Sequence, residues 1–80
     1  MKILIRNIPR ETTELELTEL FKAYGTVQSC DLVMDKETGK SKGFGFVEMP
    51  RVNEANAAIS GLNHKEISGL KIRVKKADLK

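Results

Sequence analysis

The sequence predicts an α+β fold with the element order β-α-β-β-α-β, in which two helices cover one face of a four-stranded antiparallel sheet. Two observations predict it. Short segments rich in β-branched and aromatic residues flank two longer segments whose apolar residues recur at helical spacing. Each of those two helices has one apolar side, which must be buried against the sheet. A chain of 80 residues can build one small core, so we expect a single domain over residues 1–80.

The first strand and the first helix have clear local signals. Residues 2–6, KILIR, alternate between polar and apolar side chains, and Pro9 follows. Thr13 is then a suitable N-cap for a helix, and Glu16 three residues later completes a capping box. The apolar residues of this helix are Leu15, Leu17, Leu20, Phe21 and Tyr24. We expect Gly25 to end the helix as a left-handed C′ residue.

The middle of the sequence predicts two strands joined by a polar turn. Residues 27–34, VQSCDLVM, and residues 43–49, GFGFVEM, have the composition of strands, and Pro50 ends the second of them. Between them, residues 35–41, DKETGKS, are polar and contain Gly39, which is typical of a turn.

A second helix and a last strand complete the order. Asn53 is positioned to cap the helix. The apolar residues of the helix are Ala55, Ala57, Ala58, Ile59 and Leu62. Gly61 and Gly69 interrupt the chain after the helix, and residues 70–76, LKIRVKK, are expected to form one strand. The expected buried face of that strand holds Leu70, Ile72 and Val74. Right-handed crossovers place the first and third strands side by side at the centre of the sheet.

Phe44 and Phe46 must share one face of the third strand, because side chains two residues apart in a strand point the same way. If that face were buried, Lys42 and Glu48 would be buried with the two rings. Burying unpaired charges is strongly unfavourable. The opposite register has these residues inside: Gly45, Val47 and Met49. We therefore expect Phe44 and Phe46 on the face that the helices leave open.

Basic side chains are expected on the same open face. In the first strand Lys2 and Arg6 point outward together with Leu4, and in the last strand Arg73 and Lys75 do so. The chain has a net charge of +3, and five of its last ten residues are basic while one is acidic. The first helix has an excess of acids, so charge is segregated along the chain. Exposed rings beside cations suit single-stranded nucleic acid, which has flat bases and a negative backbone.

Composition argues against several other classes of protein. No stretch approaches the roughly 20 apolar residues of a membrane span, and charges follow the start too closely for a signal peptide. The single cysteine, Cys30, excludes an internal disulfide and fits a reducing compartment, most simply the cytoplasm. Cys30 and His64 each occur alone, so no metal site is expected. No catalytic triad, carboxylate pair or phosphate loop is visible, so we expect no enzyme, no cofactor and no small-molecule substrate.

The segment KGFGFVEM, residues 42–49, resembles the octapeptide signature of the RNA recognition motif family, Lys/Arg-Gly-aromatic-Gly/Ala-Phe-Val-x-aromatic. All its positions fit except the last, where Met49 replaces an aromatic. ILIRNI, residues 3–8, resembles the family's hexapeptide signature, but Leu4 stands where that signature usually has a stacking aromatic. With the ending over residues 69–77, the resemblance covers essentially the whole chain and implies a ferredoxin-like sandwich.

The resemblance implies roles for particular residues of the open face. Phe46 would stack under a base, and Phe44 would pack against bases or sugars. Lys42 would contact a phosphate, and Asn7 would lie near the edge of the bound strand. The other candidate RNA-binding residues, from the first strand and the basic last strand, are Lys2, Leu4, Arg6, Arg73, Lys75 and Lys76.

Several of these residues also have a simpler interpretation. Leu4 is either a weak apolar platform or an ordinary surface leucine. Arg73 and Lys75 either attract phosphate or protect an edge strand from aggregation. The lysines in and beside the polar turn, which either contact RNA or are only solvated, are Lys36, Lys40 and Lys42. Cys30 has the same parity as Leu32, so we expect a buried structural thiol.

The sequence therefore predicts a non-catalytic domain that binds single-stranded RNA, and single-stranded DNA stays open as a ligand. We expect a monomer that does not bind membranes. The alternative is a protein-interaction module on the same fold, which the missing aromatic at Leu4 and the acidic first helix favour. One such domain alone resembles the small one-domain RNA-binding proteins of bacteria, and a fragment of a longer protein is the other interpretation.

Overall fold

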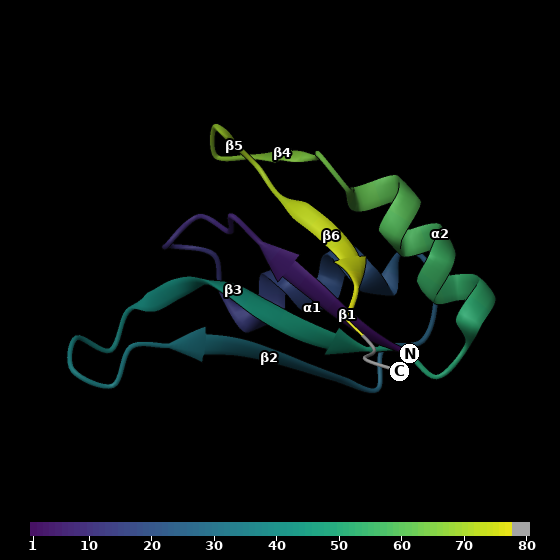
Figure 1. Cartoon of the computed structure of the whole chain (residues 1–80), viewed down its shortest axis with the longest axis horizontal. Helices are drawn as coiled ribbons and strands as arrows, with labels where there is room; N and C mark the ends of the chain where they lie inside the picture. Colours follow the sequence, from purple (N-terminus) through teal and green to yellow (C-terminus); the bar gives the residue numbers. More distant parts are fainter. Residues whose placement is uncertain (78–80) are drawn as a thin grey trace.

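The computed structural model describes residues 1–77; Asp78 and Lys80, which we counted with the basic C-terminal segment, lie outside the described residues. Four strands form an antiparallel sheet in the order β2-β3-β1-β6, and two helices cover one of its faces (Figure 1). The elements are β1 (Lys2–Arg6), α1 (Glu14–Lys22), β2 (Ser29–Met34), β3 (Ser41–Glu48), α2 (Val52–Leu62), β4 (Glu66–Ile67), β5 (Leu70–Lys71) and β6 (Arg73–Lys76). The predicted fold class and the central position of the first and third strands are confirmed.

The hydrophobic core fills the space between the sheet and the helices. From the sheet, Ile3, Ile5 and Val47 are fully buried, and Leu17 and Phe21 meet them from α1. These are the residues that strand alternation and helical spacing predict for the covered side. The core thus uses every second residue of the central strands and leaves the others to the opposite face.

Helix α1 begins as predicted but ends differently. The Thr13 hydroxyl accepts a hydrogen bond from the Glu16 N–H at 3.2 Å, and the Glu16 carboxylate accepts one from the Thr13 N–H at 3.0 Å, which confirms the capping box. Ala23 is the C-cap, and Gly25 is not a left-handed C′ residue, because its φ is 157°. A side chain at Gly25 would collide with Glu54, so the close approach of α2 explains this glycine instead.

Helix α2 does not begin at the predicted cap. Asn53 lies inside the first turn, and the N-cap position belongs to Arg51, whose side chain makes no capping hydrogen bond. Gly61, which we expected after the helix, lies within its last turn. The buried residues of the helix are Ala55, Ala58 and Leu62. Packing of this apolar face, rather than a cap, therefore holds α2 on the sheet.

Strands β2 and β3 form the predicted hairpin with shifted ends. β2 begins two residues later than predicted, although the Gln28 N–H still donates to the Glu48 carbonyl of β3 at 2.7 Å. Just before it, the Thr26 N–H donates to the Glu54 carboxylate of α2 at 3.0 Å. β3 begins two residues earlier than predicted, because the Asp35 N–H donates to the Lys40 carbonyl at 2.7 Å and closes the turn sooner. Gly39 has a φ of 73°, as suits a turn glycine.

The last part of the chain departs most from the prediction. Residues 70–76 do not form one strand: β5 pairs with β4 in a small separate hairpin, and only β6 joins the sheet. Ser68 and Gly69 form the tip of this hairpin with φ values of 50° and 84°, the signs that a two-residue type I′ turn requires. Ile72 links the two pairings and is buried. Leu70, predicted in the core, is instead 41% exposed.

Candidate nucleic-acid interface

The sheet face opposite the helices carries the two phenylalanines of β3. Phe44 and Phe46 are both partly exposed, and neither belongs to the core cluster, whereas Gly45 and Val47 are buried. The predicted direction of the pair is therefore confirmed. The ring centroids of Phe44 and Phe46 are 6.5 Å apart, and the ring planes meet at 88°. Because the planes are perpendicular, one flat group cannot stack on both rings.

The register of the sheet sets the neighbours of each ring. From β1, Leu4 is opposite Phe46 and Arg6 is opposite Phe44. From β2, Asp31 is opposite Phe46. Side chains that are directly opposite in an antiparallel pair lie on the same face and in contact range. Phe46 therefore lies between an apolar side chain and a carboxylate, and Phe44 lies beside a guanidinium.

Lys2 covers part of the Phe46 ring. Its Nζ lies 4.9 Å from the ring centroid, within the range of a cation–π interaction. Strand parity predicts Lys2 on this face, but the contact depends on the register, which pairs Lys2 with Glu48 and so places it diagonally from Phe46. Sequence reasoning missed the contact because the register could not be inferred from the residues alone.

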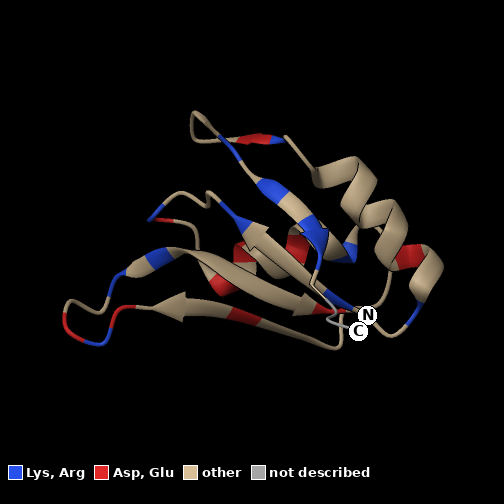
Figure 2. Cartoon of the chain, in the orientation of Figure 1, with Lys and Arg blue, Asp and Glu red and all other residues tan. Residues whose placement is uncertain are grey.

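Arg6, Arg73 and Lys75 form a basic cluster beside the aromatic pair. With Asn7 they line an open hollow of about 440 Å³, and no acidic residue of the described chain lines it. Arg6 is directly opposite Arg73, and like charges in that position repel each other. Figure 2 shows this concentration of Lys and Arg on β6 and at the end of β1, while acids gather on α1. An anion bound between the two guanidinium groups would relieve their repulsion.

The three remaining candidate residues lie in different surroundings. Lys42 is exposed at the start of β3, on the strand that carries the rings. Asn7 has a φ of 59°, and its Nδ2 donates to the Lys71 carbonyl at 2.9 Å, so its side chain ties the end of β1 to β5. Lys76 is opposite Ile3, whose side chain is buried toward the helices, so Lys76 lies on the helix side of the sheet edge. The structure does not bring Lys76 together with the open-face cations.

Acidic groups on the open face lie away from the basic cluster. The Glu48 carboxylate is 3.7 Å from the N-terminal ammonium of Met1. Asp31 is exposed on β2, which is separated from β6 by the two central strands. The face is therefore polarised, with a carboxylate on its β2 side and cations on its β1 and β6 side.

Cys30 lies on the covered side of β2, as its parity with Leu32 predicts. It is partly buried and packs against the core, with its Sγ 3.7 Å from the Glu14 carbonyl oxygen. Burial raises the pKa of the Cys30 thiol, so the group is protonated at neutral pH. Glu14 also uses its carboxylate to accept the Leu32 N–H at 3.0 Å, which joins α1 to β2.

Residues 1–77 lack two other features that would point to a different function. No group of three or more His, Cys, Asp or Glu side chains in this part of the chain is arranged to hold a metal ion. No helix in the same range has the length and apolar character needed to cross a membrane.

Known proteins share both the sequence pattern and this architecture. The RNA recognition motif family matches residues 3–73. Glycine-rich RNA-binding protein 1 of Mycosarcoma maydis is 40% identical over 77 residues, which are 96% of this chain and 44% of that protein. The crystal structure of RNA-binding protein PG1 has a TM-score of 0.93 at 42% identity, and covers 100% of this chain and 96% of its own. A complex of the Sxl-lethal protein with RNA has a TM-score of 0.92 at 28% identity, over 99% of this chain and 47% of that one.

The match includes both signature segments on the central strands. Residues 3–6 lie on β1 and residues 42–48 on β3, and alternate residues of the two strands face the open side described above. The chain spans less than half the length of the curated relatives it matches. The matched range nevertheless takes in both helices, β2, β3 and all of β1 except Lys2, and it ends at the first residue of β6. The chain belongs to the RNA recognition motif family.

Proposed function

We propose that this domain binds single-stranded RNA on the open face of its sheet. The exposed pair Phe44 and Phe46, beside the basic cluster of Arg6, Arg73 and Lys75, carries the proposal. Aromatic rings stack on bases, and cations attract the phosphate backbone. Membership of the RNA recognition motif family supports it, as do the similarity to a relative named as RNA-binding and to a protein solved with RNA.

The perpendicular rings suggest a division of roles. Phe46 stacks beneath one base, and Phe44, whose ring plane is turned by 88°, packs against a neighbouring base or sugar. Stacking on an aromatic ring contributes on the order of 1–3 kcal/mol per base. Leu4 adds apolar surface opposite Phe46 but no ring, so one stacking platform is lost. We expect about three or four nucleotides to lie across the sheet.

The phosphate backbone is proposed to run over β1 and β6. Arg6, Arg73 and Lys75 lie there, whereas Asp31 on β2 would repel phosphate. A base that stacks on Phe46 must displace the Lys2 ammonium from the ring. The displaced ammonium remains beside the bound strand and can then pair with a phosphate.

Titration of the labelled domain with a random pool of single-stranded RNA tests the proposal. We expect the amide resonances of β1, β3 and β6 to shift, and those on the outer sides of α1 and α2 to stay in place. If no amide of the four strands moves, the proposal is wrong. The same titration with single-stranded DNA shows whether the 2′-hydroxyl contributes to recognition.

We further propose that the domain acts as a cytoplasmic monomer and binds without catalysing a reaction. Its single cysteine suits a reducing compartment, and the proposed site offers stacking and charge rather than a nucleophile. Sedimentation of the free domain should give a mass near 9.0 kDa. A stable dimer, or recovery of the native protein outside the cytoplasmic fraction, would contradict this part of the proposal.

A second candidate function, binding of another protein, has support on α1. Leu15 is 69% exposed and, with Leu20 and Ile67, lines an open hollow of about 390 Å³. Glu16 and Glu19 also line it. An apolar hollow with an acidic rim is complementary to a partner segment that carries an apolar side chain between lysines or arginines. This surface lies on the helix layer, so it could act beside the RNA-binding face.

Capture of partners after nuclease treatment tests this second candidate. A partner that wild type and Phe46→Ala both retain, but that Leu15→Asp loses, would support docking on α1. If Leu15→Asp retains every nuclease-resistant partner, this candidate fails. Retention by Phe46→Ala is the necessary control, because it separates protein contacts from contacts made through RNA.

A further inference from the structure

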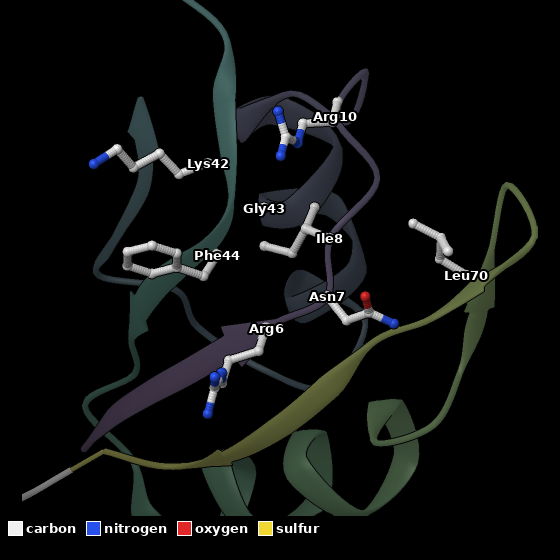
Figure 3. A pocket seen from close by; sticks show the side chains of 8 residues that line it. All are labelled: Arg6, Asn7, Ile8, Arg10, Lys42, Gly43, Phe44 and Leu70. Carbon is white, nitrogen blue, oxygen red and sulfur yellow. The ribbon is translucent and has the colours of Figure 1, made fainter. Parts of the chain in front are cut away.

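A second hollow adjoins the open face where β1 ends and β3 begins. It is open to solvent and has a volume of about 330 Å³. Its walls come from the end of β1 with the loop after it, from the start of β3 and from β5 (Figure 3). The residues that matter most are Arg6, Ile8, Arg10, Lys42, Phe44 and Leu70. We call it the end hollow.

Hydrogen bonds hold the walls of the end hollow in place. The Ile8 N–H donates to the Gly43 carbonyl at 2.8 Å and joins the loop to β3. The Asn7 side chain donates to the Lys71 carbonyl at 2.9 Å and joins the loop to β5. Asn7 and Gly43 have φ values of 59° and 86°, which asparagine and glycine adopt more readily than other residues. The end hollow is therefore built into the fold before any ligand enters.

The charges around the end hollow favour an anion. Arg6 and Arg10 stand at opposite ends of it in Figure 3, and Lys42 lies on the β3 side. No acidic residue of the described chain lines it. Glu11, next to Arg10 in the chain, does not line it. Hydrogen bonds from two backbone N–H groups of its turn lower the pKa of the Asp35 carboxyl, and Lys42 and Arg10 lower it further. Those hydrogen bonds already engage the Asp35 carboxylate.

The apolar walls favour more than a bare anion. Leu70 lies on one side of the end hollow and Phe44 on the other, and Ile8 is the buried residue between them (Figure 3). Leu70 is 41% exposed and does not belong to the core, so burial does not explain a leucine at this position. Apolar walls between cations suit a ligand with a flat ring and a negative group, as in a nucleotide. The volume is at the lower end of the usual range for ligand sites, about 300–1,000 Å³, which argues for one such unit.

The end hollow is continuous with the RNA-binding face. It shares Arg6 and Asn7 with the basic hollow beside Arg73 and Lys75, and it shares Phe44 with the aromatic pair. A strand that passes from Phe46 to Phe44 along β3 therefore reaches the end hollow next. No acidic side chain of the described chain lines either of the two joined hollows.

We propose that the end hollow binds one further nucleotide of the RNA after the strand leaves the sheet beyond Phe44. The phosphate of that nucleotide lies beside Arg10, and its base packs against Leu70. This inference rests on the proposed RNA-binding function. It adds Arg10 and Leu70, which lie outside the four-stranded sheet, to the residues that contact RNA, and it lengthens the segment that the domain recognises.

Binding of a short and a long RNA tests the inference. Single-stranded RNAs of about four and about eight nucleotides would be titrated, since the sheet alone accommodates only the shorter length. Arg10→Ala should weaken binding of the long RNA by roughly three- to tenfold and lower its salt slope by about 0.7, the value for one lost phosphate contact. The short RNA should bind this variant as it binds wild type. Leu70→Thr, which keeps the strand propensity, should weaken the long RNA alone and leave its salt slope unchanged.

Matched variants complete the design. Lys22→Ala removes one exposed cation from the far end of α1, so it should change neither affinity if the effect of Arg10→Ala is local. Circular dichroism melting establishes that each variant is folded. Phe46→Ala should weaken both lengths, because both use the sheet.

Three results would overturn the inference. Equal weakening of both lengths by Arg10→Ala would mean that Arg10 has no site of its own beyond the sheet. Unchanged affinity of both lengths would mean that the end hollow takes no nucleotide. If wild type binds neither RNA, the proposed function fails and the inference fails with it. This result can be told apart from the first two, because in both of those wild type still binds the short RNA.

Discussion

The two faces of the central sheet are made from alternate residues of the same strands, yet only one of them holds the fold together. On β1, Ile3 and Ile5 are fully buried, whereas Leu4 between them is partly exposed. On β3, Val47 is fully buried, whereas Phe46 beside it remains accessible. Apolar surface that stays in contact with water contributes little to stability, so the accessible rings call for another explanation.

Adjacent residues of one strand therefore serve different purposes, one contributing to stability and the next to binding. The buried residues of the covered face exclude water and carry no charge, whereas the open face combines two rings with arginines and lysines. Substitutions on the covered face should therefore change the free energy of unfolding. Substitutions on the open face should change RNA affinity and leave unfolding almost as it was.

Ile5→Ala should produce the largest effect, and on stability. Ile5 is fully buried on β1 between its neighbours β3 and β6, so truncation leaves a cavity that should lower the free energy of unfolding by about 2–5 kcal/mol. A domain of this size has roughly 5 kcal/mol or somewhat more in total. Urea unfolding measures the loss. Where Ile5→Ala does not fold, Ile5→Val should lose about 0.5–1.5 kcal/mol, and no loss in that variant would contradict the buried role.

Leu4→Phe should strengthen RNA binding. The new ring would lie opposite Phe46, at the position where the family's hexapeptide signature usually has a stacking aromatic. We expect about fivefold tighter binding, the low end of the range for one stacked base, and a change in unfolding free energy below about 0.5 kcal/mol. Fluorescence anisotropy with a labelled RNA measures the gain. Leu15→Phe on α1 is the matched control, and equal affinity in Leu4→Phe and wild type would make Leu4 an ordinary surface leucine.

Lys2→Gln should have a smaller effect that depends on salt. The substitution removes one positive charge that can pair with a phosphate, and it also removes the cation–π contact of about 0.5–1 kcal/mol that a stacked base must displace, so the two changes partly cancel. Binding should be weaker than wild type at low salt, and the difference should shrink as salt rises, since the salt slope falls by about 0.7. A difference that stays constant across salt concentrations would show that Lys2 makes no ionic contact with the backbone.

Acidification should have the smallest effect, in the turn that joins β2 and β3 outside both faces. Hydrogen bonds from the Glu37 and Thr38 N–H groups hold the pKa of the Asp35 carboxyl below its usual value of about 3.9. Because the pKa is lower in the folded state, the contribution of Asp35 to stability is present above the unfolded pKa and is lost as pH falls through the folded pKa. The Glu37 and Thr38 amide resonances should follow this titration, and in Asp35→Asn they should not.

Local signals in the sequence were sufficient for much of the fold. The capping box of Thr13 and Glu16 depends on residues three apart, so it can be recognised without knowing the tertiary structure. The direction of Phe44 and Phe46 follows from alternation along one strand and from the charges of Lys42 and Glu48. Neither prediction requires knowing which strands are neighbours in the sheet.

The features that the sequence did not reveal depend on register and on contacts between distant segments. Lys76 is an exception, because it lies two residues after the buried Val74, and strand alternation alone places it on the helix side, where it pairs with Ile3. The Asn7 side-chain amide donates a hydrogen bond to the Lys71 carbonyl, 64 residues away in the sequence. The β4–β5 hairpin had a signal in Ser68 and Gly69, but the alternation of residues 70–76 favoured a longer strand, and it misplaced Leu70.

One measurement tests the central claim most directly: RNA affinity and urea unfolding of Phe46→Ala beside wild type and Leu15→Ala. Leu15 is an exposed apolar residue on α1, so its truncation controls for loss of surface area alone. We predict that Phe46→Ala binds single-stranded RNA at least about tenfold more weakly, as loss of one stacked base implies, while its free energy of unfolding changes by less than about 1 kcal/mol. Wild-type affinity in Phe46→Ala, or a loss of stability of about 2–5 kcal/mol typical of a core residue, would contradict an RNA-binding open face.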